Sequence, residues 1–343
     1  MYLIHKADNA MKILWLKDSK TGHLHKAKGL LRAISDLKTI EIVEYEVRWR
    51  WSGIRAVLSI LGELGLRLPI RWFLKNSPDL TDISLILSAG GSTQWPNAAM
   101  AIQFGKSNVF LGSPRQLNPK YFSLIAFHDA PSQTAPYYRF EIIPSMVTPV
   151  AAQEAAHLAH LNDSRTWGIL IGGDGEDISW TEANYRAIAD AFIAVAKRQS
   201  VKVRIATSRR TPPQIEIILR KLFQDANILS ESCWYHQREV TAPSLLAMMG
   251  ACSRVYVTAD SMSMTHEAVS SGRPVFVILP PIRGNLRLMS NLAHLESSRY
   301  IVLQNISDLT KIDVSPSDGW QIITSDPTQG LAQAVLNAHS CGL

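Results

Sequence analysis

Short apolar runs alternate along the chain with stretches whose apolar residues recur at three- and four-residue spacing. The first pattern is typical of buried strands and the second of helices that cover a sheet. The expected strands are 12–17, 40–47, 80–88, 108–112, 123–127, 167–171, 201–207, 254–258 and 274–279. The expected helices are 24–37, 95–105, 181–199, 212–223, 263–270 and 331–338. Regular alternation of the two predicts α/β architecture with parallel sheets.

The alternation forms two series, separated by a loop and helix over 144–164. A chain of 343 residues is long enough for two hydrophobic cores. We therefore expect two domains of similar size, 1–150 and 151–343. Whether the terminal helix, 331–340, packs back on the first domain is left open.

Composition narrows the class of protein. With 46% hydrophobic and 19% charged residues, the chain is neither disordered nor fibrous. Its three cysteines, Cys233, Cys252 and Cys341, lack zinc-binding spacing and suit a reducing compartment. No apolar run approaches the ~18 residues of a spanning helix, and the start lacks a signal-peptide core. We expect a cytoplasmic protein.

The net charge of +6 is concentrated in the first half of the chain. Residues 1–150 carry 18 Lys and Arg against 11 Asp and Glu, whereas residues 151–343 carry 17 against 18. Within 48–75, six basic residues accompany only Glu63. So basic a region predicts an anionic partner.

The same basic stretch has an amphipathic pattern. Apolar residues recur at helical spacing over 54–61, and tryptophans and arginines lie close by. The flanking residues are Arg48, Trp49, Arg50, Trp51 and Arg55. This pattern favours an interfacial helix on an anionic membrane, the alternative being a core helix with charged flanks. No nucleic-acid-binding motif accompanies it.

The strongest local motif is 257–268, in which a strand ends, small polar residues make a turn and a helix begins. Amide groups at such a helix start would bind a phosphate, and Glu267 would accept hydrogen bonds from a ribose. The alternative is an ordinary helix start with Ser263 as N-cap.

Two further loops follow predicted strands. Residues 207–212 place Arg209 and Arg210 at a strand-to-helix turn, which suits a diphosphate or is simply a solvated basic turn. The loop after the first strand carries Asp18 and His23, either of which would serve as a general base if it reached an acceptor hydroxyl. The dinucleotide pattern GxGxxG and the P-loop are both missing, so neither chemistry is expected.

Several stretches together resemble the bacterial branch of the mitochondrial-fission ELM (elongated mitochondria) family. They are 18–23, Gly-Ser-Pro-Arg at 112–115, Phe-His-Asp at 127–129, Ile-Gly-Gly at 171–173, 208–212, 257–268 and 271–275. The stretches span nearly the whole chain in order. The first loop departs from the family pattern, with Ser19 in place of a glycine and Lys26 in place of a glutamine.

The family in turn resembles GT-B glycosyltransferases, in which two Rossmann-like domains have parallel sheets facing a central cleft. The resemblance implies that 1–150 is the acceptor side and 151–343 the nucleotide-sugar donor side. It implies a donor site formed by Gly172, Gly173, Ser208, Arg209, Arg210, Asp260, Ser261, Met262, Ser263, Met264 and Glu267. Residues 233–237 would lie beside the nucleotide base of the donor. The absence of Asp-x-Asp fits a metal-independent enzyme, so no metal or cofactor is expected.

The sequence therefore predicts a glycosyltransferase that is peripheral on the inner face of the cytoplasmic membrane. Its partners would be a nucleotide-sugar donor and an anionic glycolipid, that is, a lipid-linked or phosphorylated envelope glycan such as lipopolysaccharide core. Asp18 is the first candidate base, followed by His23 and Asp129. Lys20 and Gly22 are expected near the acceptor. The alternatives are a non-catalytic recruitment protein of GT-B fold, as plant members of the family suggest, and a GT-B-fold epimerase or phosphorylase.

Overall fold

A computed structural model describes residues 10–51, 70–115, 117–161, 165–175, 178–237, 242–281, 286–311 and 319–340. The chain divides into two compact units. The first comprises Met1–Met146 and Pro327–Leu343, and the second comprises Val147–Asp326. The C-terminal helix thus belongs to the first unit.

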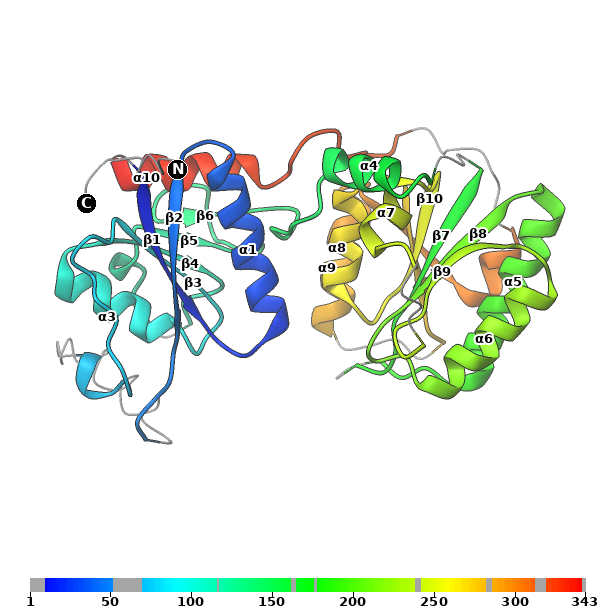
Figure 1. Ribbon diagram of the computed structural model, residues 1–343, viewed down its shortest axis with the longest axis horizontal. Coiled ribbons are helices and arrows are strands. Elements are labelled where there is room, and N and C mark those ends of the chain that lie inside the picture. Colours follow the sequence, from blue (N-terminus) through cyan, green and yellow to red (C-terminus); the bar gives the residue numbers. More distant parts are fainter. Residues whose placement is uncertain are drawn as a thin grey trace, which may run out of the picture. The chain divides into compact units, whose positions relative to one another are not determined.

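The first unit contains a six-stranded sheet with the order β2-β1-β3-β4-β5-β6, in which every neighbouring pair is parallel (Figure 1). The strands are β1 (Met11–Lys17), β2 (Ile40–Glu46), β3 (Leu85–Ala89), β4 (Ser107–Leu111), β5 (Leu124–Ala126) and β6 (Tyr137–Tyr138). All five residues of β3 are buried, as expected for a central strand covered on both faces.

Helices cover both faces of this sheet. One core cluster joins β1, β3 and β4 to α1 (Thr21–Ser35) and α10 (Gln329–Ser340). A second cluster, on the alternate residues of β1 and β3, includes α3 (Gln94–Phe104) and η1 (Ile70–Trp72). Opposite faces of the same strands supply the two clusters because successive side chains point to opposite sides of a sheet.

The second unit has its own six-stranded parallel sheet, in the order β12-β11-β10-β7-β8-β9. Figure 1 labels β7, β8, β9 and β10 of this sheet. The strands are β7 (Thr166–Ile171), β8 (Lys202–Thr207), β9 (Leu229–Cys233), β10 (Arg254–Thr258), β11 (Val275–Leu279) and β12 (Ile301–Asn305). The helices are α4 (Pro149–Leu158), α5 (Glu182–Gln199), α6 (Pro213–Asp225), α7 (Leu245–Gly250), α8 (Met262–Ser270) and α9 (Leu286–Ser297).

Both sheets have a point at which the strand order reverses direction. In the first unit the chain moves outward to β2 and then restarts at β3, so the switch lies between β1 and β3. In the second unit the switch lies between β7 and β10, and its order is that of the Rossmann fold. Ligands of open α/β sheets bind at the carboxyl ends of the strands at such switch points.

The observed elements differ from the predicted ones mainly in short segments. The strand expected over 80–88 begins only at Leu85, because Leu80 and Ile83 form a turn whose side chains are buried in the core. Five strands and α-helices within the described ranges were not predicted, namely β6, β9, α7, α9 and β12. Four of these have six residues or fewer, too short for a clear hydrophobic period.

Candidate functional site

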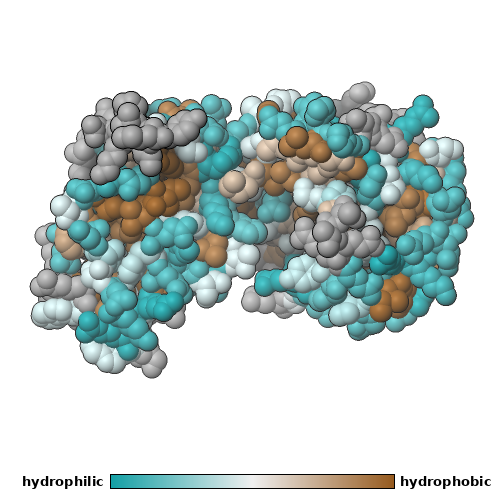
Figure 2. Space-filling model, viewed as in Figure 1, coloured by the Kyte–Doolittle hydropathy of each residue, from teal (hydrophilic) through white to brown (hydrophobic). Residues whose placement is uncertain are grey.

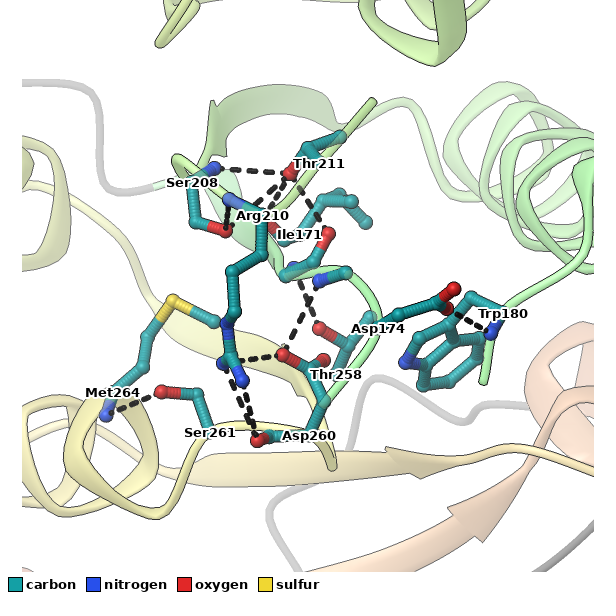
Figure 3. A network of polar contacts seen from close by, with 12 residues as sticks. Ile171, Asp174, Trp180, Ser208, Arg210, Thr211, Thr258, Asp260, Ser261 and Met264 are labelled. Atoms are coloured by element: carbon teal, nitrogen blue, oxygen red, sulfur yellow. Dashed lines mark hydrogen bonds and ion pairs between the residues drawn. The ribbon is translucent and has the colours of Figure 1, made fainter. Parts of the chain in front are cut away.

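The switch point of the second unit is a close approach between two loops. The Gly172 amide donates to Thr258 Oγ1 at 2.7 Å, and the Gly173 amide donates to Asp260 Oδ2 at 3.2 Å (Figure 3). A Cβ on Gly172 would lie 2.0 Å from Asp260 Oδ2, and one on Gly173 would lie 1.9 Å from the carbonyl oxygen of Arg210. Glycine is therefore required here by packing, and both amides already have protein partners.

Arg210 and Asp260 form an ion pair across this loop junction. Arg210 Nη2 lies 2.6 Å from Asp260 Oδ2, and the guanidinium also donates to the Asp260 carbonyl (Figure 3). The Asp260 side chain is fully buried, whereas that of Arg210 is 31% exposed. The Thr211 hydroxyl ties the same loop to the carbonyls of Ile171 and Gly172, at 3.0 and 2.7 Å. Three strand ends are thus held together by polar contacts.

Burial sets the protonation preference of Asp260. Desolvation raises its pKa, and the hydrogen bond from Thr258 and the charge of Arg210 oppose this effect without cancelling it. Within the described ranges, Asp260 Oδ1 is buried without a hydrogen-bond partner. The carboxyl is therefore an internal brace whose charge is costly to bury.

The two adjacent arginines have different surroundings. Ser208 shapes their turn, since its amide donates to Thr211 Oγ1 at 3.0 Å and its hydroxyl accepts from the Arg210 amide at 3.2 Å. Arg210 turns inward to Asp260, whereas Arg209 is exposed and has no recorded ion pair or hydrogen bond within the part of the chain that the structure describes. Of the two, Arg209 is the cation that is available to a ligand.

Helix α8 starts at this edge. Its N-cap is Ser261 and not Ser263, because Ser261 is the last extended residue and its Oγ accepts from the Met264 amide at 3.4 Å. The first amides of the helix, those of Met262 and Ser263, have no carbonyl four residues back within the helix to bind. Glu267 lies further along the same helix and is half-buried. The predicted N-cap at Ser263 was wrong by two residues.

The loop after β9, which was expected beside the nucleotide base of a donor, is held by hydrogen bonds to α6. Glu216 on α6 is fully buried and accepts hydrogen bonds from the Tyr235 amide at 2.9 Å and the His236 amide at 3.0 Å. It also accepts from the Thr207 hydroxyl at the end of β8. Glu216 was not predicted, because an acidic residue in the first turn of an amphipathic helix ordinarily faces water.

The acidic loop that follows Gly173 has a structural role at its first residue. Asp174 Oδ1 accepts from the Trp180 amide at 2.7 Å and the Ser179 hydroxyl at 3.3 Å (Figure 3). The other two acids of the loop, Glu176 and Asp177, lie outside the described residues. Over the described ranges, no group of three or more His, Cys, Asp and Glu side chains is placed to hold a metal ion.

The switch point of the first unit brings together Asp18, His23 and Ser92. Asp18 Oδ2 accepts from Ser92 Oγ at 2.6 Å and lies 2.7 Å from His23 Nδ1, while Asp18 Oδ1 accepts from the Lys20 amide at 3.1 Å. The Asp18 side chain is 9% exposed and that of His23 27%. Burial alone would raise the pKa of Asp18, but the hydrogen bonds from Ser92, His23 and Lys20 lower it overall.

Ser92 lies 74 residues from Asp18 and was not predicted. Its position after Gly90-Gly91, at the end of a buried strand, was the available signal. Gly90 has φ +89°, and a Cβ there would lie 2.0 Å from His23 Nδ1, so the imidazole packs directly on this turn. Lys20 is the N-cap of α1 and Gly22 lies in its first turn, which places both in the same loop region.

Asp129 does not join this cluster. It follows β5, which is three strands away from β1, or about 14 Å at the usual strand spacing. Its carboxylate is 67% exposed and lies 2.8 Å from Nε2 of the neighbouring His128. The contacts in the structure thus group Asp18 with His23 and leave Asp129 apart.

The basic segment begins and ends in an antiparallel pairing. Trp49 bridges Leu74, and Arg50 Nε donates to the Leu74 carbonyl at 2.8 Å. Trp51 and Trp72, at the two ends of the intervening segment, are 57% and 56% exposed. Arg55 and the helix expected over 54–61 lie outside the described residues.

On the face drawn in Figure 2, hydrophilic residues lie over both units, with separate hydrophobic patches between them. Arg48, one of the predicted acceptor-side cations, pairs with Glu46 at 2.5 Å. None of the helices within the described ranges is both long and apolar enough to cross a bilayer.

Solved structures share this architecture. UDP-GlcNAc 2-epimerase from Methanocaldococcus jannaschii aligns with a TM-score of 0.58 at 10% identity, covering 95% of this chain and 100% of that one. A complex of that enzyme with UDP-GlcNAc and UDP aligns at 0.50 and 12% identity, with the same coverage. MurG of Acinetobacter baumannii aligns at 0.44 and 12% identity, over 97% and 95%. The two six-stranded parallel sheets and the two epimerase alignments show a GT-B-like fold, as predicted.

The sequence match is more specific. The chain belongs to the family described as Mitochondrial fission ELM1, whose sequence model matches residues 21–338. This confirms the resemblance found in the motifs. A Rickettsia prowazekii protein, Uncharacterized protein RP120, is 25% identical over 131 residues. That match spans 38% of this chain and 36% of the relative.

Proposed function

We propose that the protein is a metal-independent glycosyltransferase that uses a nucleotide-sugar donor. The observation that carries the proposal is the switch point of the second unit. There the exposed Arg209 and the start of α8 belong to loops that the Arg210–Asp260 ion pair holds together. A cation and free helix amides together suit a diphosphate, and they stabilise the charge that develops as a nucleoside diphosphate leaves. The epimerase of similar fold was solved with UDP-GlcNAc and UDP, which supports a donor of this class.

The braced loops suggest separate roles for the predicted donor residues. Because the amides of Gly172 and Gly173 bind Thr258 and Asp260, these glycines would shape the site rather than bind phosphate. Arg210 would hold the turn through Asp260, leaving Arg209 to contact the donor. Glu267 remains the proposed ribose ligand.

On the acceptor side, we assign the general base to His23 and the orienting role to Asp18. An ionised carboxylate that accepts three hydrogen bonds and has a lowered pKa is a weak base at neutral pH. The same carboxylate favours the imidazole tautomer with the proton on Nδ1, which leaves Nε2 to accept a proton from the acceptor hydroxyl.

The proposed acceptor is a lipid-linked or phosphorylated envelope glycan such as lipopolysaccharide core, reached from the membrane surface. Two exposed tryptophans, Trp51 and Trp72, flank the most basic part of the chain. Tryptophan partitions into the headgroup region, and each basic residue near an anionic surface adds about 1 kcal/mol of attraction. Peripheral binding to an anionic membrane follows as part of the proposal.

The proposal is tested by measuring nucleotide binding before sugar transfer is assayed. The full chain is screened by thermal shift against UDP, GDP, ADP, dTDP and CMP and their sugars, because a ligand of the native state raises Tm. We expect one nucleotide class to bind, and Arg209→Gln to weaken it by about tenfold. Arg186→Gln, which changes an exposed arginine on α5 that pairs with Glu182, is the matched control. If no nucleotide or nucleotide sugar binds, the non-catalytic recruitment role is favoured instead.

A further inference from the structure

The Gly-Ser-Pro-Arg motif at 112–115 has no role in the function proposed above. It follows β4, whose neighbour β3 ends at the Gly90-Gly91 turn. Arg115 has φ +49°, in the left-handed region that side chains other than glycine rarely adopt. Such a conformation persists only where the surroundings enforce it.

The enforcing contacts converge on Pro114. Its carbonyl accepts from Nε2 of Gln94 and from the Leu117 amide, the latter at 3.0 Å. Gln94 is the first residue of α3 and is buried. A buried side chain thus holds the turn from within the unit, and the direction of Arg115 is set by the fold rather than by its own preference.

The Arg115 side chain reaches the turn on which His23 rests. A Cβ on Gly91 would lie 3.9 Å from Cζ and Nη1 of Arg115, and a Cβ on Gly90 would contact the His23 ring. Consecutive Cα atoms are only 3.8 Å apart. The guanidinium and the imidazole therefore pack on adjacent residues of one two-glycine turn.

The local charge favours an anion at this point. Arg115 is exposed, and no described residue is recorded as its hydrogen-bond or ion-pair partner. The nearby carboxylate of Asp18 is almost completely buried and is bonded to Ser92, His23 and Lys20. Asp129, on the next strand end, contacts His128 Nε2 at 2.8 Å, and no ion pair between Asp129 and Arg115 is found among the described residues. An incoming anion would meet a guanidinium whose charge is not neutralised.

We propose that Arg115 binds an anionic group of the acceptor, a phosphate or carboxylate, and thereby holds the acceptor hydroxyl beside His23. The proposal rests on the proposed function and narrows it to acceptors that carry an anion close to the hydroxyl that is glycosylated. A planar guanidinium suits this role because it donates two parallel hydrogen bonds to one anion.

The experiment titrates inorganic phosphate into the full chain carrying Arg209→Gln, so that the second unit contributes little, and follows the His23 imidazole by NMR. We expect saturable movement of the His23 resonances. Adding Arg115→Gln should weaken phosphate binding by about tenfold or more. Arg115→Lys should retain part of it. Lys38→Gln, which removes an exposed cation preceding β2 at the opposite edge of the sheet, should leave it unchanged.

Two further arms identify the source of the anion. Glycerol 3-phosphate tests a soluble phosphomonoester, and vesicles of phosphatidylglycerol against phosphatidylcholine test a lipid headgroup. The proposal is overturned if His23 does not respond to phosphate, or if Arg115→Gln and Lys38→Gln bind phosphate, glycerol 3-phosphate and vesicles equally. Nucleotide binding by the chain with native Arg209 is measured separately. That measurement would reveal a failure of the proposed donor function, whereas a failure of the Arg115 site would not affect it.

Discussion

The two switch points occupy equivalent places in their sheets but are built differently. In the second unit, the fully buried Asp260 carboxyl binds Arg210 and the Gly173 amide, and the Gly172 amide binds Thr258. In the first unit, Asp18 is hydrogen-bonded to Ser92, His23 and Lys20, while His23 is partly exposed and Arg115 is exposed. We call the carboxyl edge of the second sheet the closed edge, because its polar groups bind one another, and that of the first sheet the open edge.

This difference indicates how each edge would work. A closed junction gives a rigid platform on which backbone amides and one exposed arginine can meet a ligand that carries its own charge. An open cluster keeps titratable groups accessible, as proton transfer to or from a substrate requires.

The largest effect is expected from His23→Ala in a sugar-transfer assay. Removing a general base should lower the rate by about 10²- to 10⁴-fold while nucleotide binding by the second unit is unchanged. Asp18→Asn should cost less, because it removes only the orientation of the imidazole. If Asp18→Asn abolished transfer and His23→Ala left it intact, Asp18 would be the base and our assignment would be reversed.

The closed edge should be intolerant of a single methyl group. A Cβ on Gly173 would meet backbone atoms of Arg210, which cannot move without displacing the loop, so Gly173→Ala should lower the unfolding free energy by about 1–3 kcal/mol. Gly91→Ala at the open edge meets only the Arg115 side chain, at 3.9 Å, and should cost less than about 0.5 kcal/mol. Urea unfolding midpoints measure both. Equal losses would remove the distinction between the two edges.

The paired and exposed arginines should separate stability from binding. Arg210→Gln leaves a buried carboxylate without its cation and should destabilise the fold by about 1–2 kcal/mol, a value moderated by the partial exposure of Arg210. Arg209→Gln should leave Tm within error and weaken nucleotide binding only. Thermal melts with and without nucleotide give both numbers. The reverse pattern would exchange the roles of the two residues.

The smallest effect is expected in the pH dependence of the unfolding free energy, which should have opposite signs for Asp18→Asn and Asp260→Asn. The lowered pKa of Asp18 stabilises the fold above pH 3.8, and this contribution is lost as the pH falls through the folded-state pKa. The raised pKa of Asp260 stabilises the protonated form, and that contribution is lost as the pH rises through its folded-state pKa. Between pH 3 and pH 6, rising pH should therefore increase the stability deficit of Asp18→Asn relative to wild type and shift Asp260→Asn in the favourable direction.

Those opposite shifts are measured by urea unfolding at several pH values. Asp79→Asn, which changes an exposed aspartate that caps a turn through Thr81, is a control for a lowered pKa outside either switch point. Parallel slopes for Asp18→Asn and Asp260→Asn would mean that the two carboxyls share one environment.

Local pattern was sufficient for much of the fold. Alternating apolar runs and helical periods located nine of the twelve strands in the described part of the chain, counting the one whose start was set too early, and most of the helices. The pattern missed β6, β9, β12 and the short α7, because a few residues carry no readable period, and it also missed α9. Ordered motifs along the whole chain were sufficient for the family.

Only part of each candidate site could be predicted from the sequence. Residues within one loop, such as Asp18 and His23, could be grouped because sequence neighbours stay together in space. Ser92, Thr258, Thr211 and Glu216 could not, because each reaches its partner across strands that are distant in the chain. Arg209 and Arg210 are indistinguishable as letters, and only packing against Asp260 separates them.

Periodicity and residues adjacent in the chain were enough to predict the two parallel α/β units, the family and the loops in which polar residues gather. Which of those polar groups already have protein partners became clear only from the folded structure. It turned two glycine amides and one arginine into internal braces, and it left His23, Arg115 and Arg209 available. The physical reason is that a hydrogen bond or an ion pair depends on distance and burial, and strand order, not sequence order, sets both.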